Sequence, residues 1–352
     1  MLIYIFLVIE ILLFNLLRKN KNITNKQYCK IIGISMILIT GLRGVNVGSD
    51  TTVYYLNFND LSDMSFAQLI SEDMRDKGYY ILAWAVNKWT GSFHILTLIA
   101  AITFYWPISK MIAEYSEDCG LSYLILLAFN FFQFSMTGIR QTMALGFAVL
   151  FIMEILREQT RFHLTVLWLV LGTLMHHSCL LMLIYYIIRL TRKSKKLMWG
   201  TVILIPILFL LRSQITVLLL ALFDSIGFEL STYIGSGGGI TTYLVYILLF
   251  VWGLFFTYKD DKQETGMPVE YMNIIGIATA LQSFVVVNSI FFRVVWYFAL
   301  FQIIFIPKLL TTSKVTEKSV GIMRFIIYIG ILYMYLGITM SSANVVPYSF
   351  LE

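Results

Sequence analysis

Charged residues are scarce in this chain. Only 13% of its 352 residues are Asp, Glu, Lys or Arg, whereas a soluble globular domain has about 25%. Hydrophobic residues make up 59% of the sequence, and the mean hydropathy is +0.79. No soluble fold could hide so much apolar surface in one core. The low charge therefore excludes an ordinary soluble protein and predicts an all-α polytopic membrane protein.

Paired cysteines and the common catalytic motifs are also missing. The three cysteines have no paired spacing, so the sequence offers no disulfide framework and no cysteine metal site. It has no P-loop, no H-E-x-x-H, no G-x-S-x-G and no Asp-x-Asp metal clip. The net charge of +6 comes from short basic clusters between apolar runs, which is not a nucleic-acid footprint. We expect no nucleic-acid partner, no cofactor and no metal.

Long apolar runs are what the chain has instead. They recur along the whole length and approach the ~20 residues needed to cross a ~30 Å hydrocarbon layer. The first run lacks a basic start and ends in a basic cluster, so we expect a retained span rather than a cleaved signal peptide. About twelve spans are predicted, at 2–17, 28–42, 92–113, 121–136, 139–156, 162–175, 177–190, 197–211, 241–257, 269–288, 292–307 and 322–340.

Three basic clusters predict the orientation of these spans. They lie at Arg18–Lys30, Arg189–Lys196 and Lys308–Arg324, and the positive-inside rule assigns such short loops to the cytoplasm. All three share that side if both termini face outward. The prediction is thus a single transmembrane domain over residues 1–352, with outer loops at 43–91 and 212–240.

One apolar segment is too short to span. Residues 78–89 ("GYYILAWAVNKW") are rich in Trp and Tyr, which favour membrane interfaces. We predict a re-entrant or interfacial helix on the outer face, within the 43–91 loop. The alternative is a crossing helix, which would reverse the orientation of every later loop.

Arginines from well-separated spans approach the predicted outer surface. Ionisable residues in spans are costly and usually mark function, although snorkelling to the interface is the ordinary alternative. Arginine grips phosphate through two parallel hydrogen bonds, and near an outer membrane face the obvious polyanion is the diphosphate of a lipid-linked sugar. The predicted diphosphate-binding residues are Arg43, Arg140, Arg212 and Arg293.

Two histidines and one aspartate are candidates for a general base. His176 and His177 interrupt an apolar run, where a neutral imidazole could take the proton of a sugar hydroxyl. A buried structural role is the alternative for either ring. Asp50 is the rival base, or else the N-cap of a helix that starts at Thr51.

Polar and aromatic neighbours of these residues are predicted to position the substrate. Gln141 follows Arg140 directly, and Tyr297 lies one turn after Arg293 on the same helix face. Tyr54 and His177 complete this group. Because no metal pair is present to neutralise a departing diphosphate, arginines would have to do so.

Five segments in this order resemble a known family. They are "LRGVNVGSDTTVYY", "KGYYILAWAVNKW", "SMTGIRQTMAL", "MHHSCLLML" and "FFRVVWYF". Together, from about Arg43 to Phe301, they resemble the EpsG-like branch of Wzy-type bacterial polysaccharide polymerases. The family usually has an acidic residue and Pro before the Gly-aromatic pair, where this chain has "RDKGYY", and it favours Asn where Thr137 and Gly138 stand. The departure at "RDKGYY" leaves Asp76 outside the candidate set.

The resemblance implies a GT-C-like membrane fold and a glycosyl-transfer reaction. A growing glycan on undecaprenyl diphosphate would be the donor, and a second lipid-diphosphate-linked repeat unit would be the acceptor. The reaction would take place at the outer face of the bacterial cytoplasmic (inner) membrane, among membrane lipids, with a chain-length regulator as a further partner. The spacing of His two residues before Ser in the family favours His176 as the base.

Two other functions fit parts of the same pattern. A flippase or transporter of lipid-linked oligosaccharides would also bind diphosphate with arginines, although transporters commonly show repeated halves with sites at the midplane, and no internal repeat is evident here. A membrane O-acyltransferase would use a histidine in an apolar helix, but would leave the outward arginines without a purpose.

Overall fold

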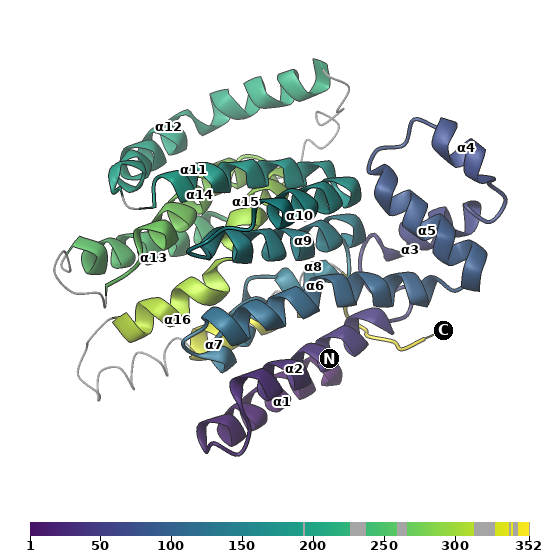
Figure 1. The fold of residues 1–352 in the computed structure, drawn as a ribbon, viewed down its shortest axis with the longest axis horizontal. Coiled ribbons are helices and arrows are strands. Elements are labelled where there is room, and N and C mark those ends of the chain that lie inside the picture. Colours follow the sequence, from purple (N-terminus) through teal and green to yellow (C-terminus); the bar gives the residue numbers. More distant parts are fainter. Residues whose placement is uncertain are drawn as a thin grey trace. The chain divides into compact units, whose positions relative to one another are not determined.

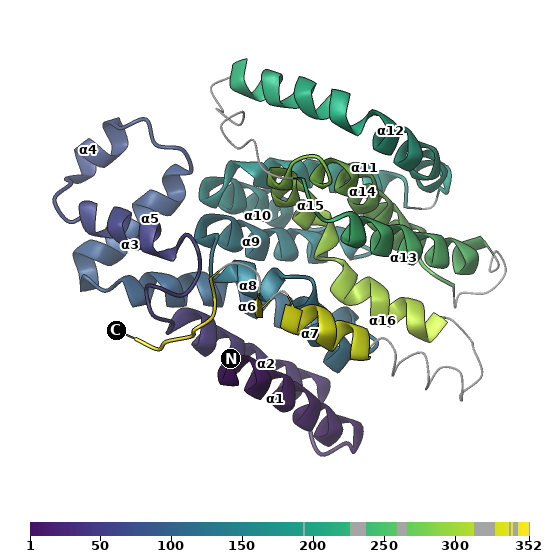
Figure 2. The same cartoon turned by 180° about the vertical axis from the view of Figure 1, so that it is seen from behind.

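The described parts of the chain are helical. The computed structural model describes residues 1–192, 194–225, 237–258, 266–312, 328–337, 339–340 and 344–351. Within those ranges every regular element is helical, and extended backbone pairs only in one isolated bridge between Arg43 and Phe350 (Figures 1 and 2). The all-α prediction is confirmed.

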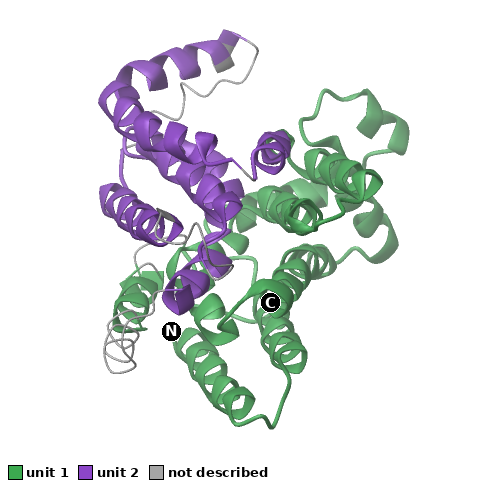
Figure 3. Cartoon of the chain, turned by 60° about the vertical axis from the view of Figure 1, so that its left-hand side comes forward, with its two compact units in different colours: residues 1–180, 315–352 green, residues 181–314 purple. Residues whose placement is uncertain are grey.

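The contacts within the chain define two compact units. The first comprises residues 1–180 and 315–352, and the second comprises residues 181–314 (Figure 3). Each unit is described by itself below. The single transmembrane domain predicted for residues 1–352 stays a prediction.

The first unit holds most of the helices. Their bounds are α1 Leu2–Lys19, α2 Asn25–Gly41, α3 Thr51–Asp60, α4 Phe66–Ser71, α5 Lys77–Thr90, α6 Phe93–Tyr115, α7 Cys119–Ala128, α8 Phe131–Ser135, α9 Ile139–Leu156 and α10 Phe162–Met175. A further helix covers Tyr328–Gly337. The helices α2, α6, α9 and α10 pack in that succession, and α3, α4 and α5 gather at one end of them (Figures 1 and 2).

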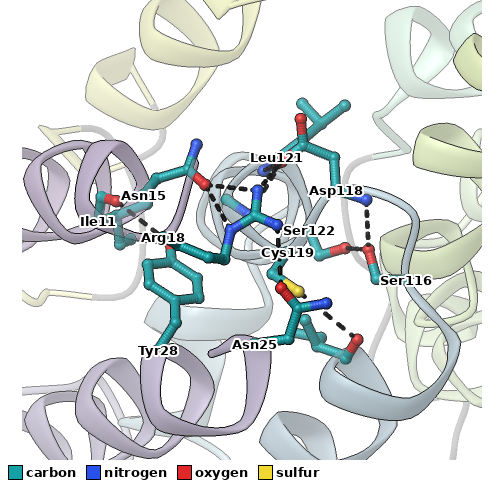
Figure 4. Close-up of polar contacts among 12 residues, drawn as sticks. Ile11, Asn15, Arg18, Asn25, Tyr28, Ser116, Asp118, Cys119, Leu121 and Ser122 are labelled. Atoms are coloured by element: carbon teal, nitrogen blue, oxygen red, sulfur yellow. Dashed lines mark hydrogen bonds and ion pairs between the residues drawn. The ribbon is translucent and has the colours of Figure 1, made fainter. Parts of the chain in front are cut away.

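The other end of this unit is held together by Arg18. Its guanidinium donates to Asn15 on its own helix, to Asn25 at the start of α2, and to Asp118 before α7 (Figure 4). Asp118 in turn accepts hydrogen bonds from the backbone N–H groups of Gly120 and Leu121, which caps α7. A cation placed between a helix C-terminus and two helix N-termini thus fixes three helix ends at one level.

The second unit is built around α14. The 3₁₀ helix His177–Leu183 leads into it and is followed by α11 Ile184–Leu190, α12 Lys196–Ser225, α13 Ile240–Tyr258, α14 Val269–Val285, a 3₁₀ turn at Ser289–Phe291, α15 Phe292–Ala299 and α16 Gln302–Thr312. The helices α12, α13 and α15 all pack against α14. The side chains of α14 are accordingly buried along much of its length.

Several predicted spans are confirmed as helices within a few residues, and others are wrong in their bounds. The predicted span at 121–136 is broken at Asn130, whose φ of 66° lies in the left-handed region that asparagine tolerates. The predicted 292–307 span is divided into α15 and α16, which meet at a bend of 56°. The segment 177–190 begins as a 3₁₀ helix rather than an α-helix.

The predicted end of a span at residue 211 is also wrong. The helix α12 continues through Arg212 to Ser225, so the first part of the predicted 212–240 loop is helical. No helix breaker stands between these residues, and apolar side chains continue past the arginine. Residues 226–236 of that loop lie outside the described residues. So do residues 313–327, which include the start of the predicted 322–340 span.

The described helices are those of a membrane protein. Four are long and apolar enough to cross a bilayer, at 93–115, 139–156, 196–222 and 240–257. A fifth is reached if the bent pair 289–299 and 302–312 counts as one span. Several of the remaining apolar helices are shorter, such as α10 and α7. The number of about twelve spans therefore stays a prediction.

Candidate active site

A buried carboxylate, Asp76, joins three of the polar residues of the first unit. Its Oδ2 atom lies 2.9 Å from Nδ1 of His176 and 3.1 Å from Nη1 of Arg140. Its Oδ1 atom lies 2.9 Å from Nδ1 of His177 and accepts the backbone N–H of that residue at 3.0 Å. Only 1% of the Asp76 side chain is exposed. One carboxylate thus organises a guanidinium and two imidazoles.

The local sequence around Asp76 explains how it reaches the histidines. Asp76 has a φ of 59°, a left-handed conformation that turns the chain into α5. Two residues later, Gly78 packs so closely on Leu174 that a Cβ atom would lie 2.6 Å from the Leu174 side chain. Only glycine permits this approach. It brings the start of α5 against the end of α10, where His176 is the C-cap residue.

Arg140 reaches Asp76 from the second residue of α9. Its guanidinium carbon lies 5.8 Å from the ring centre of Tyr54 on α3 and 5.9 Å from that of Tyr80 on α5. These distances are typical of cation–π contacts. The Arg140 side chain nevertheless stays 31% exposed. Three side chains, from α3 and from α5 with its N-cap, thus hold this cation in place while part of it stays exposed.

The environment sets the charges of the buried groups. Burial opposes ionisation of Asp76, but the hydrogen bonds from His176 and His177 outweigh it and hold the pKa of Asp76 well below its usual range. Burial lowers the pKa of His176 below its usual value, and the bond to Asp76 only partly offsets this. At neutral pH the carboxylate is charged and the His176 imidazole is neutral. Its Nδ1–H then donates to Asp76, which leaves a lone pair on Nε2.

Arg43 has a different environment, although it was predicted to bind diphosphate as well. It is only 2% exposed. Its guanidinium donates to three backbone carbonyls, those of Thr40, Val47 and Met136. Burial lowers the pKa of Arg43 to about 10, so the group is still protonated near neutral pH. The diphosphate-binding role predicted for Arg43 stays a prediction, and the three contacts seen here are made inside the protein.

Arg43 fastens the loop that precedes α3 to the segment that precedes α9. The Met136 carbonyl that accepts from Arg43 also lies 2.8 Å from the Thr51 hydroxyl. Gly48, with a φ of 102°, passes so near this carbonyl that a Cβ atom would lie 2.2 Å from its oxygen. The loop therefore sets the position of α3, which carries Tyr54.

The other candidates from the first half of the chain are near this cluster in sequence but differ in their surroundings. Gln141 is buried on α9 beside Arg140. Asp50 stands at the N-cap position of α3, as predicted, but its side chain makes no capping hydrogen bond and accepts from the Ser49 hydroxyl at 3.2 Å. Asp50 is not among the side chains that contact Asp76 in the described part of the chain.

Arg212, Arg293 and Tyr297 belong to the second unit. Arg212 lies within α12, where its guanidinium donates to the Phe209 carbonyl and stacks 4.1 Å from the Phe209 ring centre. Arg293 is half-buried at the start of α15. The Tyr297 side chain is fully buried, and its carbonyl accepts the Tyr185 hydroxyl at 2.9 Å. Their predicted roles toward the substrate stay predictions.

The sequence did not single out Asp76, the residue at the centre of the cluster. A carboxylate and two imidazoles whose ligand atoms lie within 4.8 Å of one another could hold a metal ion. Here each Nδ1 atom is directed at the carboxylate, and the Arg140 cation lies 3.1 Å from the same Oδ2 atom. A divalent ion at that oxygen would meet the guanidinium charge at close range. The arrangement favours an arginine-carboxylate-histidine network over a metal centre.

One of three comparisons with known proteins gives a match. No curated protein and no solved structure matches it. The model of the EpsG family matches residues 26–350, a range that includes Arg140, Asp76 and both histidines. Because this match covers nearly all of the chain, the protein belongs to the EpsG family.

Proposed function

We propose that this protein polymerises undecaprenyl-diphosphate-linked oligosaccharide repeat units into a surface polysaccharide. Membership of the EpsG family implies a polysaccharide polymerase with glycosyltransferase activity. The proposal adds the donor and acceptor, both lipid-diphosphate-linked glycans. It also proposes that the reaction takes place at the outer face of the bacterial cytoplasmic membrane and that a GT-C-like helical fold carries the active site.

The observation that carries the proposal is the setting of Arg140. The guanidinium is fixed by Asp76 and by two tyrosine rings, yet 31% of the side chain is exposed. A cation fixed in this way is preorganised for an anion that develops charge during the reaction. The planar fork of arginine suits a diphosphate oxygen pair. Arg140 would bind the donor diphosphate and stabilise it as it leaves.

The reaction balances without a metal or a nucleotide. A hydroxyl oxygen of the acceptor sugar forms a bond to the anomeric carbon of the donor glycan. The bond from that carbon to the diphosphate oxygen breaks, and undecaprenyl diphosphate departs with the electron pair. The hydroxyl proton passes to a base. Metal independence is part of this proposal, since Arg140 supplies the positive charge that a cation would supply.

The base in this proposal is an imidazole that Asp76 orients. His176 and His177 both direct Nδ1 at the carboxylate, so each can offer Nε2 to a hydroxyl proton. The family spacing favours His176 as the base. The exposure of the rings favours His177, whose side chain is 42% exposed compared with 11% for His176. Asp50 is the remaining alternative.

The experiment that tests the function uses the purified full-length protein in nanodiscs. The only substrate is a lipid-diphosphate-linked repeat unit, and the product is read as a ladder of lipid-linked glycans on a gel. We expect a ladder with the wild type and none with Arg140→Ala. A chelator should leave the ladder unchanged. The matched control is Arg161→Ala, because Arg161 is an exposed arginine of the same unit that pairs with Glu154.

Two outcomes would overturn the proposal. If no ladder forms while the repeat unit crosses a liposome membrane, the protein is a flippase and Arg140 belongs to a transport path. If Arg140→Ala gives the same ladder as Arg161→Ala, the arginine is not part of the site. Separate His176→Gln and His177→Gln variants in the same assay identify the base.

A further inference from the structure

A groove lies between α2 and α6, in the first unit, among residues that the proposed reaction does not use. Its volume is about 350 Å³. One face of α2 lines it through Lys26, Lys30, Gly33, Ile34 and Ile37, at the spacing of successive turns. The facing side of α6 contributes Trp106, Ser109, Lys110, Ala113 and Glu114 in the same way.

The two helices run antiparallel, so the lysines near the start of α2 lie at the same end of the groove as the lysine near the end of α6. The Tyr123 hydroxyl lies 3.0 Å from the Cys29 carbonyl on α2 and 2.8 Å from the Ser109 hydroxyl on α6, which places these two residues at one level. At the opposite end of both helices, Thr97 donates to the Gly41 carbonyl. Lys26, Lys30 and Lys110 therefore gather at one mouth of the groove.

This mouth is positively charged. Three ammonium groups outnumber the single carboxylate of Glu114, and in the described part of the chain none of these lysines forms an ion pair. The Lys110 ammonium lies 5.7 Å from the Trp106 ring centre, so it is directed along the groove. The lysines of α2 also belong to the basic cluster 18–30, which the positive-inside rule assigns to the cytoplasmic surface.

The rest of the groove is apolar and open to the outside of the bundle. Ile34 is 45% exposed and Trp106 is 55% exposed. From Lys26 to Ile37 the α2 face extends about 16 Å, at ~1.5 Å per residue, which is about half of a ~30 Å hydrocarbon layer. The groove thus has the length of one leaflet, with its charge at the membrane surface.

We infer that this groove binds an anionic phospholipid of the cytoplasmic leaflet. The headgroup phosphate contacts Lys26, Lys30 and Lys110, and one acyl chain lies along Gly33, Ile34 and Trp106. Basic pockets between membrane helices on the cytoplasmic side bind acidic headgroups in this manner. A soluble phosphate would leave the apolar length of the groove unused. The inference concerns a site separate from the proposed polymerase reaction and does not depend on it.

The test counts lipids bound to the delipidated full-length protein by native mass spectrometry. Phosphatidylglycerol is compared with phosphatidylcholine of the same chains. We expect Lys30→Gln/Lys110→Gln to weaken phosphatidylglycerol binding about tenfold or more and to leave phosphatidylcholine binding unchanged. The matched control is Lys19→Gln/Lys21→Gln. It removes the same number of positive charges from exposed positions of the basic cluster 18–30, to which Lys30 belongs, but neither residue lines the groove.

Three results would overturn the inference. The first is unchanged phosphatidylglycerol binding in Lys30→Gln/Lys110→Gln. The second is an equal loss in the control, which would indicate diffuse surface charge. The third is displacement of the lipid by millimolar glycerol phosphate, which has the headgroup but no chains and would indicate a soluble phosphate ligand. Elution of each variant as one species shows that it is folded.

Discussion

Arg43 and Arg140 both stand where a predicted span meets the predicted outer surface, yet their environments differ. The Arg43 guanidinium is enclosed and donates to three backbone carbonyls. Arg140 contacts a carboxylate and two aromatic rings and remains 31% exposed. Arg43 joins separate segments of the backbone. Arg140 is fixed in place by neighbouring side chains, and part of its guanidinium side chain stays accessible.

The comparison teaches that position along a span does not decide the role of an arginine. Backbone carbonyls accept the hydrogen bonds of a buried guanidinium. The donors are then occupied within the protein. A carboxylate and tyrosine rings fix the direction of the cation and leave it accessible. We therefore expect loss of Arg43 to affect folding first and loss of Arg140 to affect activity first.

The largest effect is expected from Arg43→Ala. The substitution removes the guanidinium donor from three buried carbonyls. The Thr51 hydroxyl can still donate to Val47 or to Met136, but only to one of them at a time, and each buried acceptor left unsatisfied costs about 1–3 kcal/mol. We expect most of the folded protein to be lost, as measured by the monodisperse fraction in detergent chromatography. Arg161→Ala should behave as wild type. Full recovery of folded Arg43→Ala protein without activity would instead assign Arg43 to the substrate.

The second largest effect is expected from Arg140→Lys, which tests whether Arg140 binds the diphosphate. In Arg140→Lys the charge is kept, but the planar fork becomes a point charge. Loss of one charge-assisted hydrogen bond to the diphosphate corresponds to about 1.5–3 kcal/mol, which is on the order of ten- to a hundredfold in rate. We expect the initial rate of ladder formation to fall by that factor, while the melting temperature stays near that of the wild type. An unchanged rate would indicate that Arg140 only snorkels.

Part of this contrast could be predicted from the sequence. The apolar runs were long enough to predict the helices. The helix break at Asn130 was missed because it depends on one left-handed residue, and the bend of 56° between α15 and α16 was missed as well. Arg140, Tyr54, His176 and His177 were predicted from their residue types. The structure brings Arg140 and both histidines together at one carboxylate and places Tyr54 beside the Arg140 guanidinium.

Asp76 was missed because its role depends on a contact across the fold. It is 100 residues away from His176 in the chain, and "RDKGYY" departs from the pattern that would have marked it. The available signal was an acidic residue two positions before a glycine at a helix start, which permits close approach of another helix. The carbonyl partners of Arg43 could not be predicted for the same reason, since backbone contacts leave no trace in residue types.

The third prediction concerns pH. Because the folded-state pKa of His176 lies below its unfolded value, the unfolded chain binds more protons between those two values. Stability should therefore fall as pH drops from about 6.5, by at most about 1.4 kcal/mol per pH unit. Asp76, with a lowered pKa, adds a loss only below about pH 4. Melting temperatures from pH 7 to 5 should fall less in His176→Gln than in the wild type.

His163→Gln is the control for this measurement, because His163 is exposed on α10. It should keep the wild-type slope. The groups that face His176 are Asp76, His177 and Arg140. A slope that is lost in His177→Gln and kept in His176→Gln would reverse the assignment.

The smallest effect is expected from Thr51→Val, which probes the Arg43 region without touching its charge. The Thr51 hydroxyl lies 2.8 Å from both the Val47 and Met136 carbonyls. Arg43 also donates to these two carbonyls, so neither loses its last partner. We expect a loss of only about 1 kcal/mol, seen as a slightly lower melting temperature with normal polymerisation. A loss as large as that of Arg43→Ala would mean that the hydroxyl, and not the guanidinium, holds the loop before α3.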